Sequence, residues 1–343
     1  MIKLLRTFNG GPGIGVTPLA HDGCSALINT ADHVETRNVE TGELVASYPA
    51  TRARLVSGPQ NRLIASIYKN GSTLIKDLIT GKKIYDIPGE PLSIITMPAD
   101  GRCLGIGRCR STGFDGEYYS SFTAEICSLS EGVAYWSKQG SGDSSGGLMA
   151  IVISDDSRFA AVISFKSLIL INLPEGRTIG EWPTRALQPD DLAFTRDSSF
   201  LLVNNRPTLE IIDLASLQIR EFAAPPPGKF LSALVVSPDG AKVLAGGSGW
   251  CGMWELNSGK LLWEKQLSAN YSYSAWFLSD KGLIAVTPVM GKIEIISIRN
   301  GAAIDSMQAH ARPVTAVAES AGGRYFLTTD GNETKVWDLS AAA

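Results

Sequence analysis

The chain has few of the residues that usually carry catalysis or bind metals. It contains three histidines and five cysteines in 343 residues. His21 and His33 flank one turn without a suitably spaced carboxylate or cysteine, and no two cysteines form a CxxC pair. We therefore predict no metal site. The motifs HExxH, GxSxG and GxxxxGK[ST] do not occur in the sequence, so we expect neither enzymatic activity nor a cofactor.

One segment instead concentrates side chains that are common at protein interfaces. Between CLGIG (103–107) and FTAEICSL (122–129) the chain inserts RCRSTGFDGEYYSS (108–121). Arginine and aromatic residues are over-represented among the anchors of protein complexes. The segment supplies five candidate partner-binding residues: Arg108, Arg110, Phe114, Tyr118 and Tyr119. The alternative is a self-packed surface hairpin that binds no partner.

Two further candidates for partner binding lie in other turns. Arg206 belongs to NNRPT (204–208), and Trp250 belongs to GSGWCG (247–252), where small polar residues are more usual. Loops held by a rigid scaffold often carry binding residues. If Trp250 is exposed, it is a candidate contact residue. The alternative is that its side chain packs into the wall of a central channel of the protein.

A module that recurs about eight times must position these residues. Each copy begins with an apolar strand and a polar turn, as in VVSPDGA (235–241), followed by a strongly apolar strand such as KVLAGG (242–247). An alternating strand with a turn, MWELNSG (253–259), and a more polar strand, KLLWEKQL (260–267), complete it. Such runs between Asp-Gly and Ser-Gly turns are typical of strands and hairpins. A period near forty residues indicates small sheets that stack radially.

The last copy, AHARPVTAVAESAGGRYFLTTDGNETKVWDLS (309–340), resembles a repeat of the WD40-type β-propeller family. The other copies are degenerate, and the resemblance covers essentially the whole chain. In that family a histidine, a serine or threonine, an aspartate and a tryptophan form a buried hydrogen-bonded set. The resemblance implies this structural role for His310, Thr328 or Thr329, Asp330 and Trp337. The spacing from Asp330 to Trp337 is one residue longer than the usual pattern.

We therefore predict an all-β fold, a closed β-propeller of about eight four-stranded blades in one domain spanning 1–343. Seven blades is the alternative. The chain ends after the third strand of the last copy, and IKLLRTF (2–8) has the pattern of an unassigned fourth strand. Pairing of this strand with the last copy would close the ring and remove exposed sheet edges.

Composition restricts the classes of partner. The chain is 44% hydrophobic and 19% charged, with a formal net charge of -3. This balance does not favour binding to nucleic acid or to an anionic membrane. No run reaches the ~20 apolar residues of a membrane span, and the N-terminus lacks the apolar stretch of a signal peptide. We expect a monomeric, cytoplasmic, non-catalytic scaffold with free cysteines, whose loop face binds another protein or a peptide.

Two classes of propeller enzyme are the alternatives, each with its site at the central channel. LNSGKLLWEKQL (256–267) is similar to the tryptophan-docking repeat of the pyrroloquinoline-quinone-dependent dehydrogenases. Only Gly259 to Trp263 and Gly132 to Trp136 match the spacing of that repeat. A lactonase-type propeller would need acidic and histidine metal ligands at the channel mouth. A cluster of such ligands would favour an enzyme, and a broad aromatic and basic patch would favour a scaffold.

Overall fold

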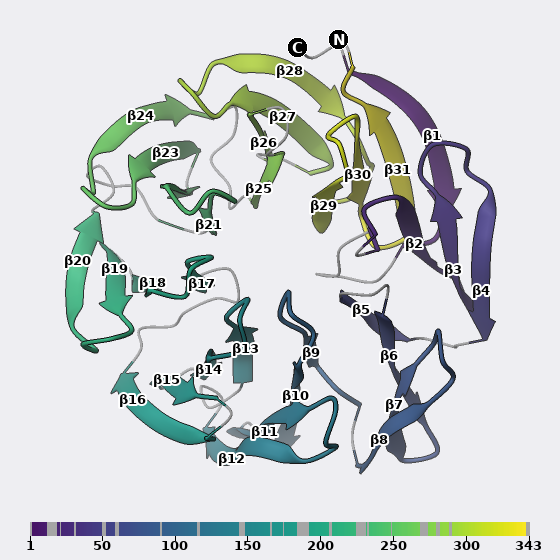
Figure 1. Ribbon diagram of the computed structural model, residues 1–343, viewed down its shortest axis with the longest axis vertical. Coiled ribbons are helices and arrows are strands. Elements are labelled where there is room, and N and C mark those ends of the chain that lie inside the picture. The colour runs from purple at the N-terminus through teal and green to yellow at the C-terminus, as the bar shows by residue number, and fades with distance from the viewer. Residues whose placement is uncertain are drawn as a thin grey trace. The chain divides into compact units, whose positions relative to one another are not determined.

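The computed structural model of the protein is all-β and consists of eight small antiparallel sheets (Figure 1). It describes residues 2–11, 19–20, 22–30, 32–49, 53–58, 62–89, 91–114, 117–143, 148–164, 167–173, 175–183, 192–205, 208–223, 231, 233–247, 249–267, 274–278, 282–287 and 290–340. At 57–58, 69, 110–114, 117–120, 141–143, 149, 223 and 233 it describes the backbone alone. Within these ranges no helix is long and apolar enough to cross a membrane.

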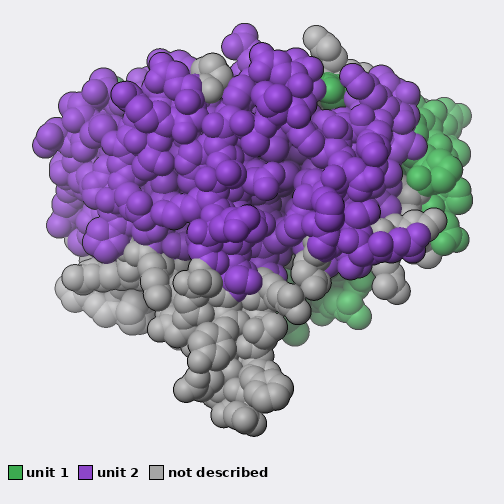
Figure 2. Space-filling view, turned by 90° about the horizontal axis from the view of Figure 1, so that it is seen from below, with its two compact units in different colours: residues 1–63, 225–343 green, residues 64–224 purple. Residues whose placement is uncertain are grey.

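The chain divides into two compact units, Met1–Leu63 with Pro225–Ala343 (unit 1) and Ile64–Ala224 (unit 2), which are coloured green and purple in Figure 2. Unit 1 holds four sheets. Their strands are β2 (Ser25–Asn29), β3 (His33–Asn38) and β4 (Leu44–Pro49); β21 (Ala233–Val236), β22 (Lys242–Gly247), β23 (Trp250–Glu255) and β24 (Leu261–Gln266); β25 (Ala275–Leu278), β26 (Leu283–Val286), β27 (Lys292–Ser297) and β28 (Ala303–Gln308); and β1 (Lys3–Asn9), β31 (Glu333–Asp338), β30 (Tyr325–Thr329) and β29 (Ala316–Glu319).

Unit 2 holds three complete sheets. Their strands are β9 (Ile94–Thr96), β10 (Cys103–Phe114), β11 (Glu117–Ser128) and β12 (Ala134–Asp143); β13 (Leu148–Ile153), β14 (Phe159–Ser164), β15 (Ser167–Asn172) and β16 (Arg177–Pro183); and β17 (Leu192–Phe194), β18 (Phe200–Asn205), β19 (Thr208–Asp213) and β20 (Ile219–Ala223). The remaining sheet contains β5 (Arg54–Gly58), β6 (Arg62–Lys69), β7 (Ser72–Asp77) and β8 (Lys83–Pro88). The boundary between the units falls inside β6.

The sheets are the blades of a β-propeller, and the predicted number of eight is confirmed. Seven have four described strands, and the sheet of the first copy has three. In that copy an isolated bridge joins Leu19 to Ala26 on β2, at the place where the other blades have their first strand. The alternative of seven blades is wrong because the weak first and second copies each form a sheet of their own.

Burial falls from the middle strands of a blade to its outermost strand. β22 and β30 are buried along almost their whole length, and β31 alternates between buried and partly exposed positions. The outermost strands β4, β24 and β28 are largely exposed. Middle strands need apolar side chains on both faces because each blade is packed on either side by its neighbours, which explains the continuous apolar runs of the second strands.

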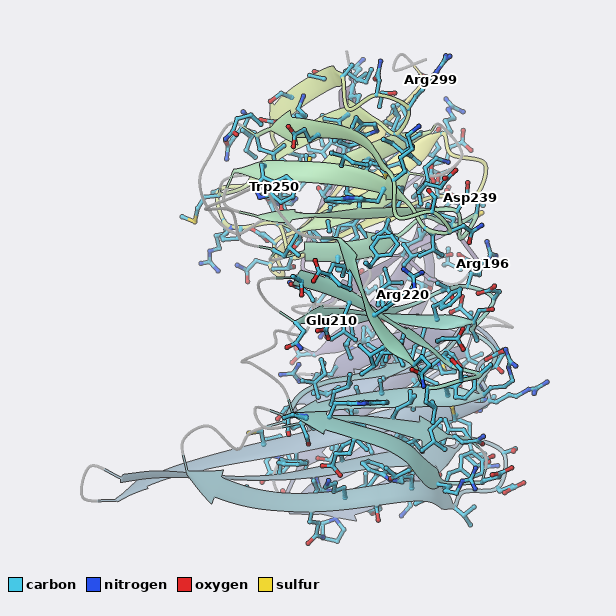
Figure 3. All side chains as sticks on the ribbon, turned by 90° about the vertical axis from the view of Figure 1, so that its left-hand side faces the viewer. Arg196, Glu210, Arg220, Asp239, Trp250 and Arg299 are labelled. Carbon is cyan, nitrogen blue, oxygen red and sulfur yellow. The ribbon has the colours of Figure 1, made fainter. Side chains whose placement is uncertain are left out.

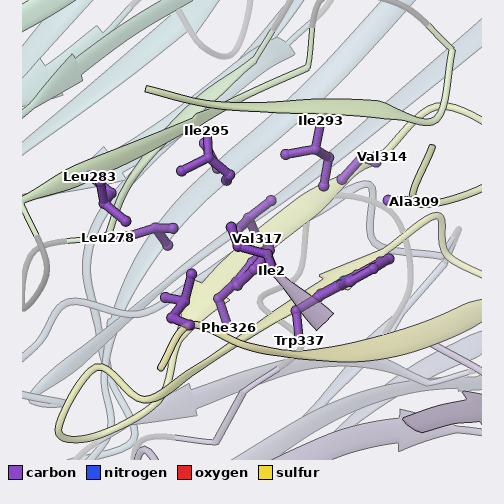
Figure 4. Close-up of a cluster of buried hydrophobic side chains, with 12 residues drawn as sticks. Ile2, Leu278, Leu283, Ile293, Ile295, Ala309, Val314, Val317, Phe326 and Trp337 are labelled. Carbon is purple, nitrogen blue, oxygen red and sulfur yellow. The ribbon is translucent and has the colours of Figure 1, made fainter. Parts of the chain in front are cut away.

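A cluster of buried side chains between two neighbouring blades of unit 1 illustrates this packing (Figure 4). Ile293 and Ile295 of β27 meet Val317 of β29 and Phe326 of β30. The rings of Phe326 and Trp337 are stacked with centroids 6.1 Å apart. Apolar faces from two sheets are thus removed from water together, which a single four-stranded sheet could not achieve.

The N-terminal strand completes the last blade, as the sequence predicts. β1 pairs antiparallel with β31, from Lys3 opposite Asp338 to Asn9 opposite Glu333. Gly11, which follows β1, is required by close packing. A Cβ on Gly11 would lie 2.6 Å from the hydroxyl oxygen of Thr329. The chain is therefore tightly packed where it leaves β1.

The turns between first and second strands share a hydroxyl that bonds an aspartate two positions later. These pairs are Ser154 with Asp156, Thr195 with Asp197, and Ser237 with Asp239, with oxygen–oxygen distances of 2.5–2.8 Å. The hydroxyl is the main cause of the lowered pKa of Asp197 and Asp239. Burial by itself would raise the pKa of Asp156. Hydrogen bonds, of which the one from the Arg158 side chain is the strongest, outweigh burial and lower the pKa of Asp156 to about 2. Charged, bonded aspartates thus stabilise the repeated turn.

Candidate functional site

The inserted segment of the third copy is a paired β-ribbon rather than an irregular loop. β10 and β11 pair over twelve positions without a register shift, from Cys103 opposite Ser128 to Phe114 opposite Glu117. β12 continues alongside β11 as far as Asp143, which lies opposite Tyr119. β9 reaches only to Gly107, so the last seven residues of β10 extend past it. We call residues 108–123 with 139–143 the ribbon; the two-residue connection 115–116 lies outside the described residues.

The base of the ribbon is anchored in its own unit. Leu148 of β13 packs so closely on Gly107 that a Cβ at this glycine would lie 2.3 Å from a Leu148 methyl carbon. Phe122 is 7% exposed and belongs to the apolar cluster shared by this blade and the next. In Figure 3 the blue-grey strands of this blade extend beyond the other strands of unit 2. The ribbon is thus a projection with a fixed root.

Four of the predicted partner-binding residues lie on the ribbon, where the backbone alone is described. Arg110 is opposite Ser121, Phe114 opposite Glu117, and Tyr119 opposite Thr112. Tyr118 is opposite Gly113. Successive residues of a strand alternate between the two faces of a sheet, so positions 110, 114 and 119 share one face of the ribbon and position 118 lies on the other. The structure therefore divides the predicted patch between two faces.

Arg108 has a structural contact of its own. Its Nη1 donates a hydrogen bond of 2.7 Å to the carbonyl oxygen of Pro88, at the end of β8. The guanidinium therefore ties the base of the ribbon to the neighbouring blade within unit 2. Its side chain remains partly exposed, so a contribution to partner binding stays a prediction. Arg206 lies outside the described residues.

Trp250 is buried, which disfavours its role as a contact residue. It begins β23, is 3% exposed, and packs edge-to-face on Trp254 with ring centroids 6.1 Å apart. Its indole nitrogen has no hydrogen-bond partner among the described residues. Trp250 is the first residue of β23 and therefore belongs to the sheet. This burial favours the packing alternative.

The last blade contains three members of the polar set that the resemblance implies, His310, Thr328 and Trp337, joined to a different carboxylate. The indole Nε1 of Trp337 donates to the hydroxyl of Thr328 (2.9 Å), which lies 2.8 Å from Nε2 of His310. The carboxylate nearest to Nδ1 of His310 is that of Glu333 at 3.0 Å, whereas Asp330 is at 3.9 Å. Asp330 instead accepts two backbone N–H groups of its own turn. Of the two candidate threonines, Thr328 is the one that joins the set.

Glu333 was missed by the sequence analysis, although a signal was present. The extra residue between Asp330 and Trp337 moves the aspartate away from the ring of His310. Glu333, at the start of β31, takes the nearer position and is also 2.9 Å from Nζ of Lys335. Neutral His310 with its proton on Nδ1 completes one directed chain, in which Trp337 donates to Thr328, Thr328 to His310, and His310 to Glu333.

His310, Asp330 and Glu333 also form the one group within the described ranges whose potential metal-ligand atoms lie within 4.8 Å of one another. Both ring nitrogens of His310 are already engaged by Thr328 and Glu333. The ammonium of Lys335 beside Glu333 adds a positive charge that would repel a cation. This geometry fits a structural hydrogen-bond network better than a metal centre.

Replacement of Thr328 by valine should destabilise the protein by about 2–4 kcal/mol, since two buried nitrogens lose their partner while the side-chain shape is kept. Urea unfolding followed by tryptophan fluorescence measures this loss. Thr80→Val, at an exposed turn position, is the matched control and should change stability by less than about 0.5 kcal/mol. Equal effects of the two variants would contradict a role for the hydroxyl in the network.

Stability should fall as the pH drops through the usual pKa of histidine, about 6.5. Burial is the main cause that lowers the pKa of His310; Lys335 adds to it, and Asp330 and Glu333 oppose it. The unfolded chain therefore binds a proton at a higher pH than the folded protein. The contribution of neutral His310 to stability is complete above about pH 6.5 and decreases below it, by at most about 1.4 kcal/mol per pH unit. Urea unfolding between about pH 7.5 and 5.5 tests this. His310→Gln should flatten the slope, and an unchanged slope would contradict the assignment.

Comparison with known proteins supports the fold but gives no family. No family model matches the chain, and no curated protein matches it significantly. Among solved structures, it is similar to the computationally designed Ika8 protein, with a TM-score of 0.71 and 14% identity over 98% of each chain. In total 1390 solved chains match, so the fold is common and does not by itself select a function.

Proposed function

We propose that the protein is a non-catalytic scaffold that binds another protein or a peptide through the ribbon of its third blade. The observation that carries this proposal is the extension of β10, β11 and β12 beyond β9. The strands of the other blades have three to eight residues, whereas β10 and β11 have twelve. Blade packing requires only the root of the ribbon, so the remainder is free to serve a partner.

The composition of the ribbon supports the same function. Arg110, Phe114, Tyr118 and Tyr119 are of the residue types that anchor interfaces. Their positions are held by paired strands, so little conformational entropy is lost when a partner binds. Two ribbon faces carrying anchors fit a partner segment that wraps around the ribbon.

Affinity capture from the source cells tests this function. The protein is used as bait in its native form and as the variant Arg110→Ala/Tyr118→Ala/Tyr119→Ala. A triple variant at exposed positions of other turns and strands of unit 2, Glu131→Ala/Glu175→Ala/Arg177→Ala, is the matched control. Specific partners should be retained by the control and reduced about tenfold or more by the ribbon variant. Equal recovery with both variants would overturn the assignment of the ribbon.

A further inference from the structure

The outer edge of β10 changes character along the strand. Near the blade it is covered, because β9 pairs with Gly105, Ile106 and Gly107. The next contact is made by Ser93, whose N–H donates to the carbonyl of Gly107 (2.8 Å) and whose hydroxyl accepts the N–H of Cys109 (3.0 Å). Beyond Cys109, no described strand lies on this side of β10.

The backbone groups on this edge can be assigned from these bonds. The C=O of Gly107 and the N–H of Cys109 bond to Ser93, so these two residues direct their backbone groups away from β11. These groups alternate in direction along an antiparallel strand, so Ser111 and Gly113 also face away from β11. The residues between them, Arg110 and Thr112, bond to β11. The outward set is thus the C=O of Cys109 and the N–H and C=O of Ser111 and Gly113. It extends about 13–14 Å from residue 109 to residue 113.

This edge has neither a register shift nor a proline or lysine to prevent strand addition, and its charged residues are Arg108 and Arg110. The outermost strand of every blade carries a register shift beside its neighbour: β1, β4, β8, β12, β16, β20, β24 and β28. The β10–β11 pairing has none. Segment 108–114 also contains neither proline nor lysine, which are common at protected edges. The regular, unshifted edge is therefore suited to accept a further strand.

We propose that an extended segment of a partner protein binds as an additional strand on the edge of β10 between Cys109 and Gly113. This inference rests on the proposed function of the ribbon and specifies its mode. Backbone hydrogen bonds supply affinity in such complexes, and alternate side chains supply selectivity. A flexible segment is the occupant that fits best, because it can follow the narrow edge and also contact both ribbon faces.

The test uses the intact protein and peptides selected against it from a random library of about twelve residues. Ser111→Pro removes the outward N–H, a change that an edge strand tolerates; Ser111→Ala keeps that N–H. Circular dichroism and thermal unfolding establish that both variants are folded. The proline variant should bind the selected peptides about tenfold more weakly or worse, and the alanine variant within about twofold of the native protein.

Amide hydrogen exchange gives a second readout that does not depend on a substitution. In the free protein, the amides of Arg110 and Thr112 should exchange slowly and those of Ser111 and Gly113 rapidly. A bound peptide should slow the last two. Unchanged exchange at these amides, full binding by Ser111→Pro, or failure to select any peptide would each overturn strand addition. So would concentration-dependent dimerisation that Ser111→Pro abolishes, since the occupant would then be a second copy.

These outcomes remain separable from the proposed function. If the ribbon triple-alanine variant loses its cellular partners while Ser111→Pro retains them, the ribbon binds partners through its side chains. Strand addition would then be wrong and the scaffold function would stand.

Discussion

A chain that lacks residues 1–9 is expected to lose most of its folding stability. β1 forms six residue pairs with β31, and the N–H of Ile2 donates to Asp305 at 2.6 Å. Ile2 is 8% exposed within the cluster that also holds Phe326. The ladder hydrogen bonds contribute about 1 kcal/mol each and the buried isoleucine about 2 kcal/mol. A loss of about 5 kcal/mol or more is comparable with the entire stability of many domains.

The deletion also removes a contact between the last blade and the first. The guanidinium of Arg6 donates to the carbonyl oxygens of Thr41 (2.8 Å) and Glu40, so the turn after β3 loses these two hydrogen bonds. It further exposes the edge of β31, which should promote aggregation.

Urea unfolding followed by far-ultraviolet circular dichroism measures the effect of the deletion. A synthetic peptide of residues 1–11, added in excess, should restore stability by binding to β31, and a scrambled peptide should not. An unfolding midpoint equal to that of the full chain would show that β1 is dispensable.

Gly291→Ala is expected to destabilise the protein by about 4 kcal/mol or more, a size diagnostic of severe steric conflict. Gly291 precedes β27 and has a φ of +64°, and a Cβ there would lie 1.8 Å from the carbonyl oxygen of His310. The neighbouring backbone cannot easily withdraw, because the N–H groups of Ala309 and His310 both donate to the carbonyl oxygen of Gly291. The clash would also displace His310 from the network with Thr328 and Glu333.

Gly322→Ala is the control that isolates backbone strain from the clash. Gly322 has a φ of +77°, and a Cβ there would meet nothing within 4 Å. The Gly322→Ala substitution should lower the free energy of unfolding by about 1 kcal/mol, since alanine is strained in a left-handed conformation even without a clash. Chemical unfolding of the two variants provides the comparison, and similar losses would refute the steric argument.

The repeat made most of the fold predictable. Apolar runs and Gly or Asp turns recur in every copy, and the pattern predicted both the eight blades and the pairing of residues 2–8 with the last copy. These properties are local, since alternation along a strand and the conformational demands of a turn act within a few residues. Even the degenerate first copy forms a sheet because its strands retain these patterns.

The candidate site was predictable in position but not in form. The break in the period located residues 108–121, but a hairpin was predicted there only as the alternative without a partner. Twelve consecutive cross-strand pairs make this segment a ribbon, and its binding potential then extends from Arg110 and Tyr119 to the backbone of Ser111 and Gly113. Residue types indicate anchors, whereas only the register reveals which backbone groups remain without a strand beside them.

By itself the sequence determined the all-β class, the closing strand and the place of the insertion, and it favoured eight blades over seven. Only the tertiary structure decided that Glu333 rather than Asp330 lies next to His310, that Trp250 is buried, and that Gly291 must lack a side chain. The physical reason is distance along the chain. Strands and turns follow from neighbouring residues, but which carboxylate reaches an imidazole depends on how strands far apart in sequence are stacked, and ångström differences decide it.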